Sequence, residues 1–156
     1  MEKGLKLKAQ DKEDLTIISA YLQDAVTVVG DFSYSPTSRI FALMLNRYQW
    51  EDHQVSTNNK DNKSCHRIRT GCHFENIINV SAQHIPQNEK KHVLELLTME
   101  TSELENGNIA IDLVFSGEEL IRLEAEVIEA SMQDIGEPYP AKCHPKHDVL
   151  ESLSKE

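Results

Sequence analysis

The sequence predicts an α+β fold in which a strand–helix unit precedes a curled, mostly antiparallel sheet of about six or seven strands, with a second helix near the C-terminus. Two changes of apolar period carry this prediction: helical spacing before residue 26 gives way to alternation over residues 28–127, and helical spacing then returns. The chain has 156 residues, of which 39% are hydrophobic and 27% charged, a composition typical of one globular domain. We therefore assign residues 1–140 to a single domain and residues 141–156 to a C-terminal tail.

The opening unit combines a short strand with the clearest helix of the chain. Residues 5–9 alternate weakly, which indicates an edge strand. Asp11 then has the position of a helix N-cap, and Asp14 stands where a capping box carries Glu or Gln. We expect a helix over residues 12–26. Its apolar face is formed by Leu15, Ile18, Leu22 and Ala25.

An antiparallel hairpin is expected next. Residues 28–34 predict one strand and residues 39–50 a longer one, with turn-forming Ser and Pro at 35–38 between them. The longer strand has apolar residues on both faces, which favours a central position in the sheet. Residues 51–64 are rich in Asn, Asp and Lys and predict a long exposed loop.

The remaining strands follow a period of two. Asn106-Gly107 is a strong hairpin signal, because both positions tolerate a positive φ. We expect Ile111, Leu113 and Phe115 to be buried on one face, opposite Ile121 and Leu123. The predicted strands in this part of the chain are residues 66–75, 77–80, 93–99, 109–115 and 121–127.

The C-terminal part predicts a helix and then an extended tail. Ile128, Met132 and Ile135 have helical spacing, and Gly136 has the position of a C-terminal cap before Pro138. Residues beyond this helix are rich in proline, and a short last helix could begin at Asp148. Seven strands followed by a helix would suit a pleckstrin-homology-like, partly open barrel, although the first helix is foreign to that plan.

Charge and composition limit the function classes. A net charge of −10 argues against binding to nucleic acid or to an anionic membrane surface, because both need a basic face. The three cysteines cannot all pair within the chain, and no apolar run has the length of a membrane span. We therefore expect a cytoplasmic protein with no nucleic-acid or membrane partner. The glycines are isolated from one another, so the sequence predicts no phosphate-binding loop and no cofactor.

Cysteine and histidine stand together in three places, which raises the question of a zinc site. Zinc needs four closely placed soft or borderline ligands. Cys65 and Cys72 are an odd number of positions apart and would face opposite sides of a strand, and Cys72 has the position of a small core residue. The third cluster consists of Cys143, His144 and His147. We assign no catalytic residue and no metal, and we keep a metal-dependent or thiol enzyme based on this third cluster as the alternative.

The most interesting candidate binding surface combines arginine with aromatic residues. Arg47, Tyr48 and Trp50 end one predicted strand, while Arg67 and Arg69 lie on the next. Arginine and tryptophan are frequent interface anchors, and arginine recognises planar anions. If the two strands pair, we expect the three arginines to converge on one side of the sheet.

Several sequence blocks resemble one family along nearly the whole chain. The chain is similar in these blocks to an uncharacterised alphaproteobacterial family, domain of unknown function 2948, with Tyr139 at a position where that family usually has Trp. The resemblance implies a bacterial cytoplasmic protein of one domain, and it implies no reaction and no catalytic residue. The blocks are SAYLQDA at 19–25, VGD at 29–31, NRYQWE at 46–51, LVFSG at 113–117, IRLE at 121–124, GEPYP at 136–140 and PKHD at 145–148.

The leading functional hypothesis is a non-catalytic binding or assembly module, since the sequence holds no complete catalytic constellation and its sheet must leave an edge unless it closes. Its partner would be a protein or a small anionic ligand, and self-association into a homo-oligomer stays open.

Overall fold

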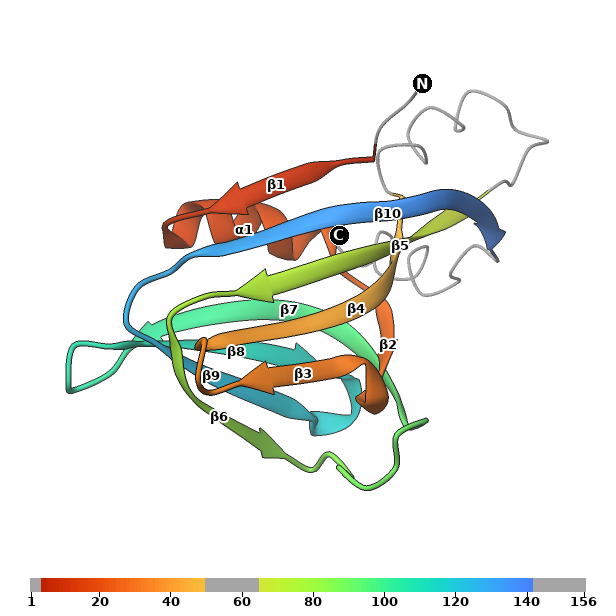
Figure 1. Ribbon diagram of the computed structural model, residues 1–156. Coiled ribbons are helices and arrows are strands. Elements are labelled where there is room, and N and C mark those ends of the chain that lie inside the picture. The colour runs from red at the N-terminus through yellow and green to blue at the C-terminus, as the bar shows by residue number, and fades with distance from the viewer. Residues whose placement is uncertain (1–3, 50–64, 142–156) are drawn as a thin grey trace, which may run out of the picture.

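The computed structural model describes residues 4–49 and 65–141, which form one large antiparallel sheet and one α-helix. Figure 1 shows β3, β4 and β5 crossing in front of β7, β8 and β9. The elements are β1 (Lys6–Ala9), α1 (Lys12–Tyr21), β2 (Val26–Val28), a 3-10 turn (Val29–Asp31), β3 (Phe32–Ser35), β4 (Ile40–Tyr48), β5 (Cys65–Phe74), β6 (Ile77–Gln83), β7 (Val93–Glu103), β8 (Ile109–Phe115), a second 3-10 turn (Ser116–Glu118), β9 (Leu120–Ala125) and β10 (Ala130–Ala141).

The strands are hydrogen-bonded in the order β1-β10-β5-β4-β2-β7-β8-β9-β6, and β3 pairs with β4 beside that path. β4 therefore has two partners along one edge: β3 beside its first half and β2 beside its end. The run from β3 through β4, β2, β7, β8 and β9 to β6 curls around a common core and leaves a gap between β3 and β6. The fold is thus mostly β, with one helix, and its sheet forms an unclosed barrel.

Helix α1 packs its apolar face into the core beside β1 and β7 (Figure 1). Leu15, Ile18 and Leu22 are buried, and Asp11 caps the helix by accepting a hydrogen bond from the Asp14 backbone N–H at 2.8 Å. The predicted cap is confirmed. The helix ends five residues before the predicted boundary, because Val26–Val28 pairs with β7 and β4 as a strand. No helix in the described part of the chain is long and apolar enough to span a membrane.

The predicted hairpins and the central core are present. β3 pairs with β4 in the register Phe32↔Leu43, and β7 pairs with β8 around a turn in which Gly107 has a φ of 90°. On β8 and β9, the expected face is buried and pairs across the strands as Ile111↔Leu123 and Leu113↔Ile121. The core prediction is therefore confirmed. The predicted strand over residues 28–34 is divided by a 3-10 turn into the end of β2 and β3.

The prediction of a second helix around Ile128, Met132 and Ile135 is wrong. Most of that segment belongs to the long strand β10, which pairs with β1 and β5. Its buried residues alternate as Ala130, Met132 and Asp134, whereas Ile135 is exposed. Asp134 hid this alternation, because a carboxylate occupies a position where the pattern requires an apolar residue. Gly136 does have a positive φ of 82°, but it lies where the register of β10 shifts, not at a helix end. The pleckstrin-homology-like plan therefore lacks its C-terminal helix. The predicted loop at 51–64 and the predicted last helix lie outside the described residues.

Candidate functional site

Arg47 lies in the interior of the protein. Its side chain is fully buried, although it was predicted at a binding surface. Nε and Nη2 of Arg47 donate to the two carboxylate oxygens of Asp134, each at 2.8 Å, and Nη1 donates to the Tyr48 carbonyl at 3.1 Å. The guanidinium also lies 5.7 Å from the centroid of the Tyr21 ring. Its charge is therefore neutralised within the core.

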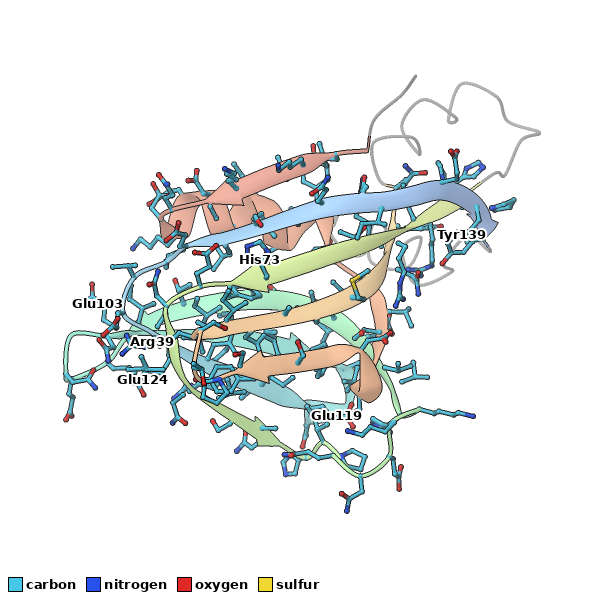
Figure 2. All side chains as sticks on the ribbon, in the orientation of Figure 1. Arg39, His73, Glu103, Glu119, Glu124 and Tyr139 are labelled. Carbon is cyan, nitrogen blue, oxygen red and sulfur yellow. The ribbon has the colours of Figure 1, made fainter. Side chains whose placement is uncertain are left out.

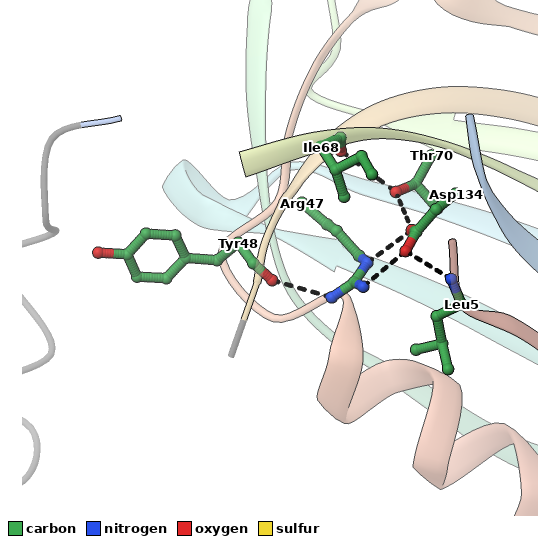
Figure 3. Close-up of polar contacts among 6 residues, drawn as sticks. All are labelled: Leu5, Arg47, Tyr48, Ile68, Thr70 and Asp134. Carbon is green, nitrogen blue, oxygen red and sulfur yellow. Dashed lines mark hydrogen bonds and ion pairs between the residues drawn. The ribbon is translucent and has the colours of Figure 1, made fainter. Parts of the chain in front are cut away.

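Asp134 collects hydrogen bonds from three elements, as Figure 3 shows. Besides Arg47, the Leu5 backbone N–H donates at 2.9 Å and the Thr70 hydroxyl donates at 2.9 Å. Burial by itself raises the pKa of the Asp134 carboxyl, but the hydrogen bonds from Arg47, Leu5 and Thr70 outweigh that effect and leave the pKa below its ordinary value. The cluster joins β4, β5, β10 and the segment before β1, so its role is to hold the sheet together.

The predicted convergence of three arginines is wrong. β4 and β5 pair in the register Arg47↔Ile68, Asn46↔Arg69 and Tyr48↔Arg67. Because directly paired residues share a face of the sheet, Arg47 points inward with Ile68, while Arg67 and Arg69 share the opposite face. The shared face of Arg67 and Arg69 was predicted correctly. Arg47 alternates with the buried Phe41, Leu43 and Leu45 along β4, so the error lay in placing a charged residue of that face at the surface.

Arg67 and Arg69 each have partners on their own face. Arg69 Nη2 lies 3.1 Å from Asp31 Oδ2, and the two side chains are 38% and 31% exposed. The Arg67 guanidinium lies 5.0 Å from the Tyr48 ring centroid and donates to the Asn46 carbonyl at 2.9 Å. These contacts link β5 to neighbouring segments. Trp50, the fifth member of the predicted surface, lies outside the described residues.

Cys72 is a core residue, as its position in the alternation predicted. It is buried in the hydrophobic cluster, and desolvation raises the pKa of its thiol to about 12. Among residues 4–49 and 65–141, no group of three or more His, Cys, Asp or Glu side chains is placed to hold a metal ion. Cys143, His144 and His147, the alternative metal set, lie outside the described residues.

A serine, a histidine and a glutamate meet on the exposed face of β5 and β10, a cluster that sequence reasoning missed because Ser131 and His73 are 58 positions apart. His73 is labelled in Figure 2. In a catalytic triad, the serine and the acid contact opposite ring nitrogens. Here the Ser131 oxygen lies 3.2 Å from both ring nitrogens of His73, and the Glu75 carboxylate contacts Nε2 at 3.3 Å. This arrangement does not have triad geometry.

The gap between β3 and β6 contains a hollow of about 270 Å³. Each of these strands has only one partner among the described strands, β4 and β9 respectively, so their other edges border the gap. The floor is aromatic and aliphatic: the Phe32 ring centroid lies 6.0 Å from that of Phe41 and 6.2 Å from that of Phe115. We call this feature the β3–β6 slot. Its lining residues are Val29, Phe32, Ser33, Tyr34, Phe41, Val80, Ser81, Ala82, Ile85, Gln87, Lys90 and Ile121.

The slot is closed at both ends by hydrogen bonds. At one end, the Ile77 N–H donates to the Arg39 carbonyl at 2.9 Å, and the Tyr34 hydroxyl donates to the Ile77 carbonyl at 3.0 Å. At the other end, the Gly30 N–H donates to the Lys90 carbonyl at 2.8 Å. A Cβ on Gly30 would lie 3.1 Å from that carbonyl oxygen, so glycine allows the close approach. The slot therefore has a defined length.

Fold and slot together define an unclosed antiparallel barrel, with a core-filling helix and a gap bounded by two strand edges. The chain belongs to the family DUF2948, described as a protein of unknown function, and the family model matches residues 5–147. The resemblance seen in the sequence is thereby confirmed. No curated protein and no solved structure matches the chain significantly.

Proposed function

We propose that this protein is a non-catalytic cytoplasmic binding or assembly module, and that its partner binds at the β3–β6 slot. The observation that carries the proposal is the hollow itself, which exposes the edge of the hydrophobic core between two unpaired strand edges. Binding sites are concave and mostly apolar, with a few polar groups that fix orientation. The slot is concave, and its lining combines apolar residues with Ser, Tyr, Gln and one Lys.

The edge of β6 carries neither of two residue types that commonly protect an edge strand. Proteins guard such edges with lysine or proline, because an unprotected edge pairs with other chains. The edge strand β1, with sequence KLKA, carries Lys6 and Lys8. β6, with sequence IINVSAQ, has seven residues and no charged residue or proline. This contrast supports β6 as an edge that is kept open for a partner.

The chemistry of the lining favours binding over a reaction. Its residues include no Asp, Glu, His or Cys, so the lining offers no carboxylate, imidazole or thiol to activate its Ser and Tyr hydroxyls. The single amine of the lining belongs to Lys90, at the end of the slot where the Lys90 carbonyl accepts a hydrogen bond from the Gly30 N–H. Such a site supplies shape, apolar contact and one positive charge.

The test is affinity capture of the tagged full-length chain from its own cells, comparing two matched variants. Ser81→Lys places a charge on the β6 edge that borders the slot, and Ser102→Lys places the same charge on an exposed residue of β7 that does not line it. We expect Ser81→Lys to lose a specific partner that the wild type and Ser102→Lys retain, with all three chains melting at similar temperatures.

Two outcomes would contradict the proposal. The first is a partner retained equally by both variants, which would place the binding surface elsewhere. The second is stoichiometric zinc in the purified wild type that disappears when Cys143 and His147 are replaced, which would favour the metal-enzyme alternative.

A further inference from the structure

We infer that the occupant of the slot is a single extended peptide segment that adds to the edge of β6 as a strand, places one apolar side chain in the hollow and sets a carboxylate beside Lys90. This inference rests on the proposed function and names the partner's chemistry. It is carried by three features of the slot: its two flanking edges, its floor and its charge.

The flanking edges call for one extended chain. An edge strand presents unpaired backbone N–H and C=O groups, and an added strand satisfies them. Here β3 and β6 stand on the two sides of the hollow, and the hydrogen bonds that close it at Ile77 and at Gly30 limit the added strand to the length between them. A folded partner that offers its own sheet edge would bring a neighbouring strand with it, for which the slot has no room. The same reason argues against a second copy of this chain, because its β6 edge is likewise bordered by β3.

The floor calls for an apolar side chain. Phe32, Phe41 and Ile121 form an apolar surface at the bottom of the hollow, and Val80 and Ile85 add to its wall. Phe32, Tyr34, Val80 and Ile85 are only partly buried although they pack against the core. Side chains on an added strand alternate, so every second side chain of the peptide points toward this floor. The volume of about 270 Å³ suits one large apolar side chain.

The charge calls for a carboxylate. Lys90 is the one ionised side chain that lines the slot. The protein as a whole carries a net charge of −10 and repels an acidic segment at long range, so the attraction for a carboxylate comes from this local amine alone. A carboxylate on the peptide would form a charge-assisted hydrogen bond with Lys90.

The experiment uses the purified full-length chain and a phage library of random linear dodecapeptides. The consensus peptide is then synthesised with a fluorophore, and its Kd is measured by anisotropy. We expect a consensus with alternating apolar residues and an acidic residue. Lys90→Glu should weaken its binding at least about tenfold, because it replaces an attraction by a repulsion. The matched control, Lys91→Glu, changes a neighbouring residue outside the lining and should leave the Kd within about twofold.

Hydrogen exchange supplies a readout that a change of stability alone would not move. Adding the peptide should slow exchange of amides in β3 and β6, and it should leave the edge strand β1 unchanged. Protection elsewhere, a consensus of helical period, or equal affinity in Lys90→Glu and Lys91→Glu would overturn the inference. If no peptide binds while Ser81→Lys still abolishes partner capture, the inference about the occupant fails and the proposed function stands.

Discussion

Arg47 and Asp134 form a fully buried, bidentate ion pair that joins two strands not adjacent in the sheet. The two side chains are 0% and 1% exposed, and the hydrogen bonds from Nε and Nη2 of Arg47 to the Asp134 carboxylate are each 2.8 Å. β5 lies between β4 and β10, and its Thr70 donates to the same carboxylate. The pair therefore crosses β5 on the inner face. The Asp134 carboxylate oxygens also accept hydrogen bonds from the Thr70 hydroxyl and the Leu5 backbone N–H. The buried ion pair therefore has the additional hydrogen bonds that compensate for its loss of hydration.

Removing one member of this pair should be severely destabilising. Arg47→Met leaves the Asp134 carboxylate buried without its cation, which should lower the free energy of unfolding by about 3–5 kcal/mol. The double variant Arg47→Met/Asp134→Leu removes both charges and should be more stable than Arg47→Met alone. Urea unfolding followed by circular dichroism measures both values. The single variant Asp134→Leu completes the cycle, and a loss in the double variant equal to the sum of the losses in the two single variants would show that the charges do not interact.

A matched substitution at Arg69 should be nearly neutral. Arg69 also forms an ion pair, but its side chain is 38% exposed and that of Asp31 is 31% exposed. Solvent-accessible pairs contribute about 0–1 kcal/mol, because water screens the attraction and the side chains lose freedom. Arg69→Met should therefore change the free energy of unfolding by less than about 1 kcal/mol in the same urea experiment. A loss as large as that of Arg47→Met would mean that exposure does not govern these pairs.

Acidification should remove the contribution of Asp134. Its pKa is lower in the folded protein than in the unfolded chain, so the unfolded state binds the proton first as the pH falls. The stabilisation is complete above the ordinary Asp pKa of about 3.9 and is lost as the pH falls through the lower folded value. The difference in unfolding free energy between wild type and Asp134→Asn should therefore stay constant from pH 7 to about pH 5 and shrink as the pH falls below about 4. A difference independent of pH would contradict the assigned role.

The burial of Phe115 offers a test of the core that the sequence predicted. Its side chain is 1% exposed, and its ring stacks on Phe32 with centroids 6.2 Å apart. Phe115→Ala should cost about 3–5 kcal/mol, because it removes apolar contact and leaves a cavity. Ile78→Ala, at a residue that is 37% exposed on β6, is the control and should cost far less. Thermal unfolding compares the two, and equal melting temperatures would contradict the assignment of β8 to the core.

The sequence was informative where local pattern and tertiary structure agree. The Asp11 cap, the Asn106-Gly107 turn and the alternation through Phe115 are local signals, and each of these elements is present. β10 was misread because Asp134, a charged residue, occupies a buried position. Its partner Arg47 lies 87 positions earlier in the chain, so no local pattern could show that the charge is compensated.

The candidate site was harder to predict than the fold. The arginine surface failed because β4 has apolar residues on both faces, so its sequence did not show that the face of Arg47 is the buried one, and a buried arginine needs a partner that only the fold supplies. The β3–β6 slot depends on the path of the whole sheet, since β3 and β6 become neighbours only through the curl of the strands between them. The absence of charge from the segment IINVSAQ was the one available signal, and it has meaning only once β6 is known to be an edge.

The Cys72 thiol should be unreactive in the folded protein. It is 2% exposed, and its pKa of about 12 leaves almost no thiolate at neutral pH, although thiolate is the species that attacks alkylating reagents. Alkylation of the peptide that contains Cys72, measured by mass spectrometry, should therefore be slow in buffer and fast in urea. Its rate should increase in Arg47→Met, because a less stable protein opens more often. Fast alkylation of Cys72 in the native wild type would contradict its place in the core. An unchanged rate in Arg47→Met would show that the opening that exposes Cys72 on β5 does not depend on the Arg47–Asp134 ion pair.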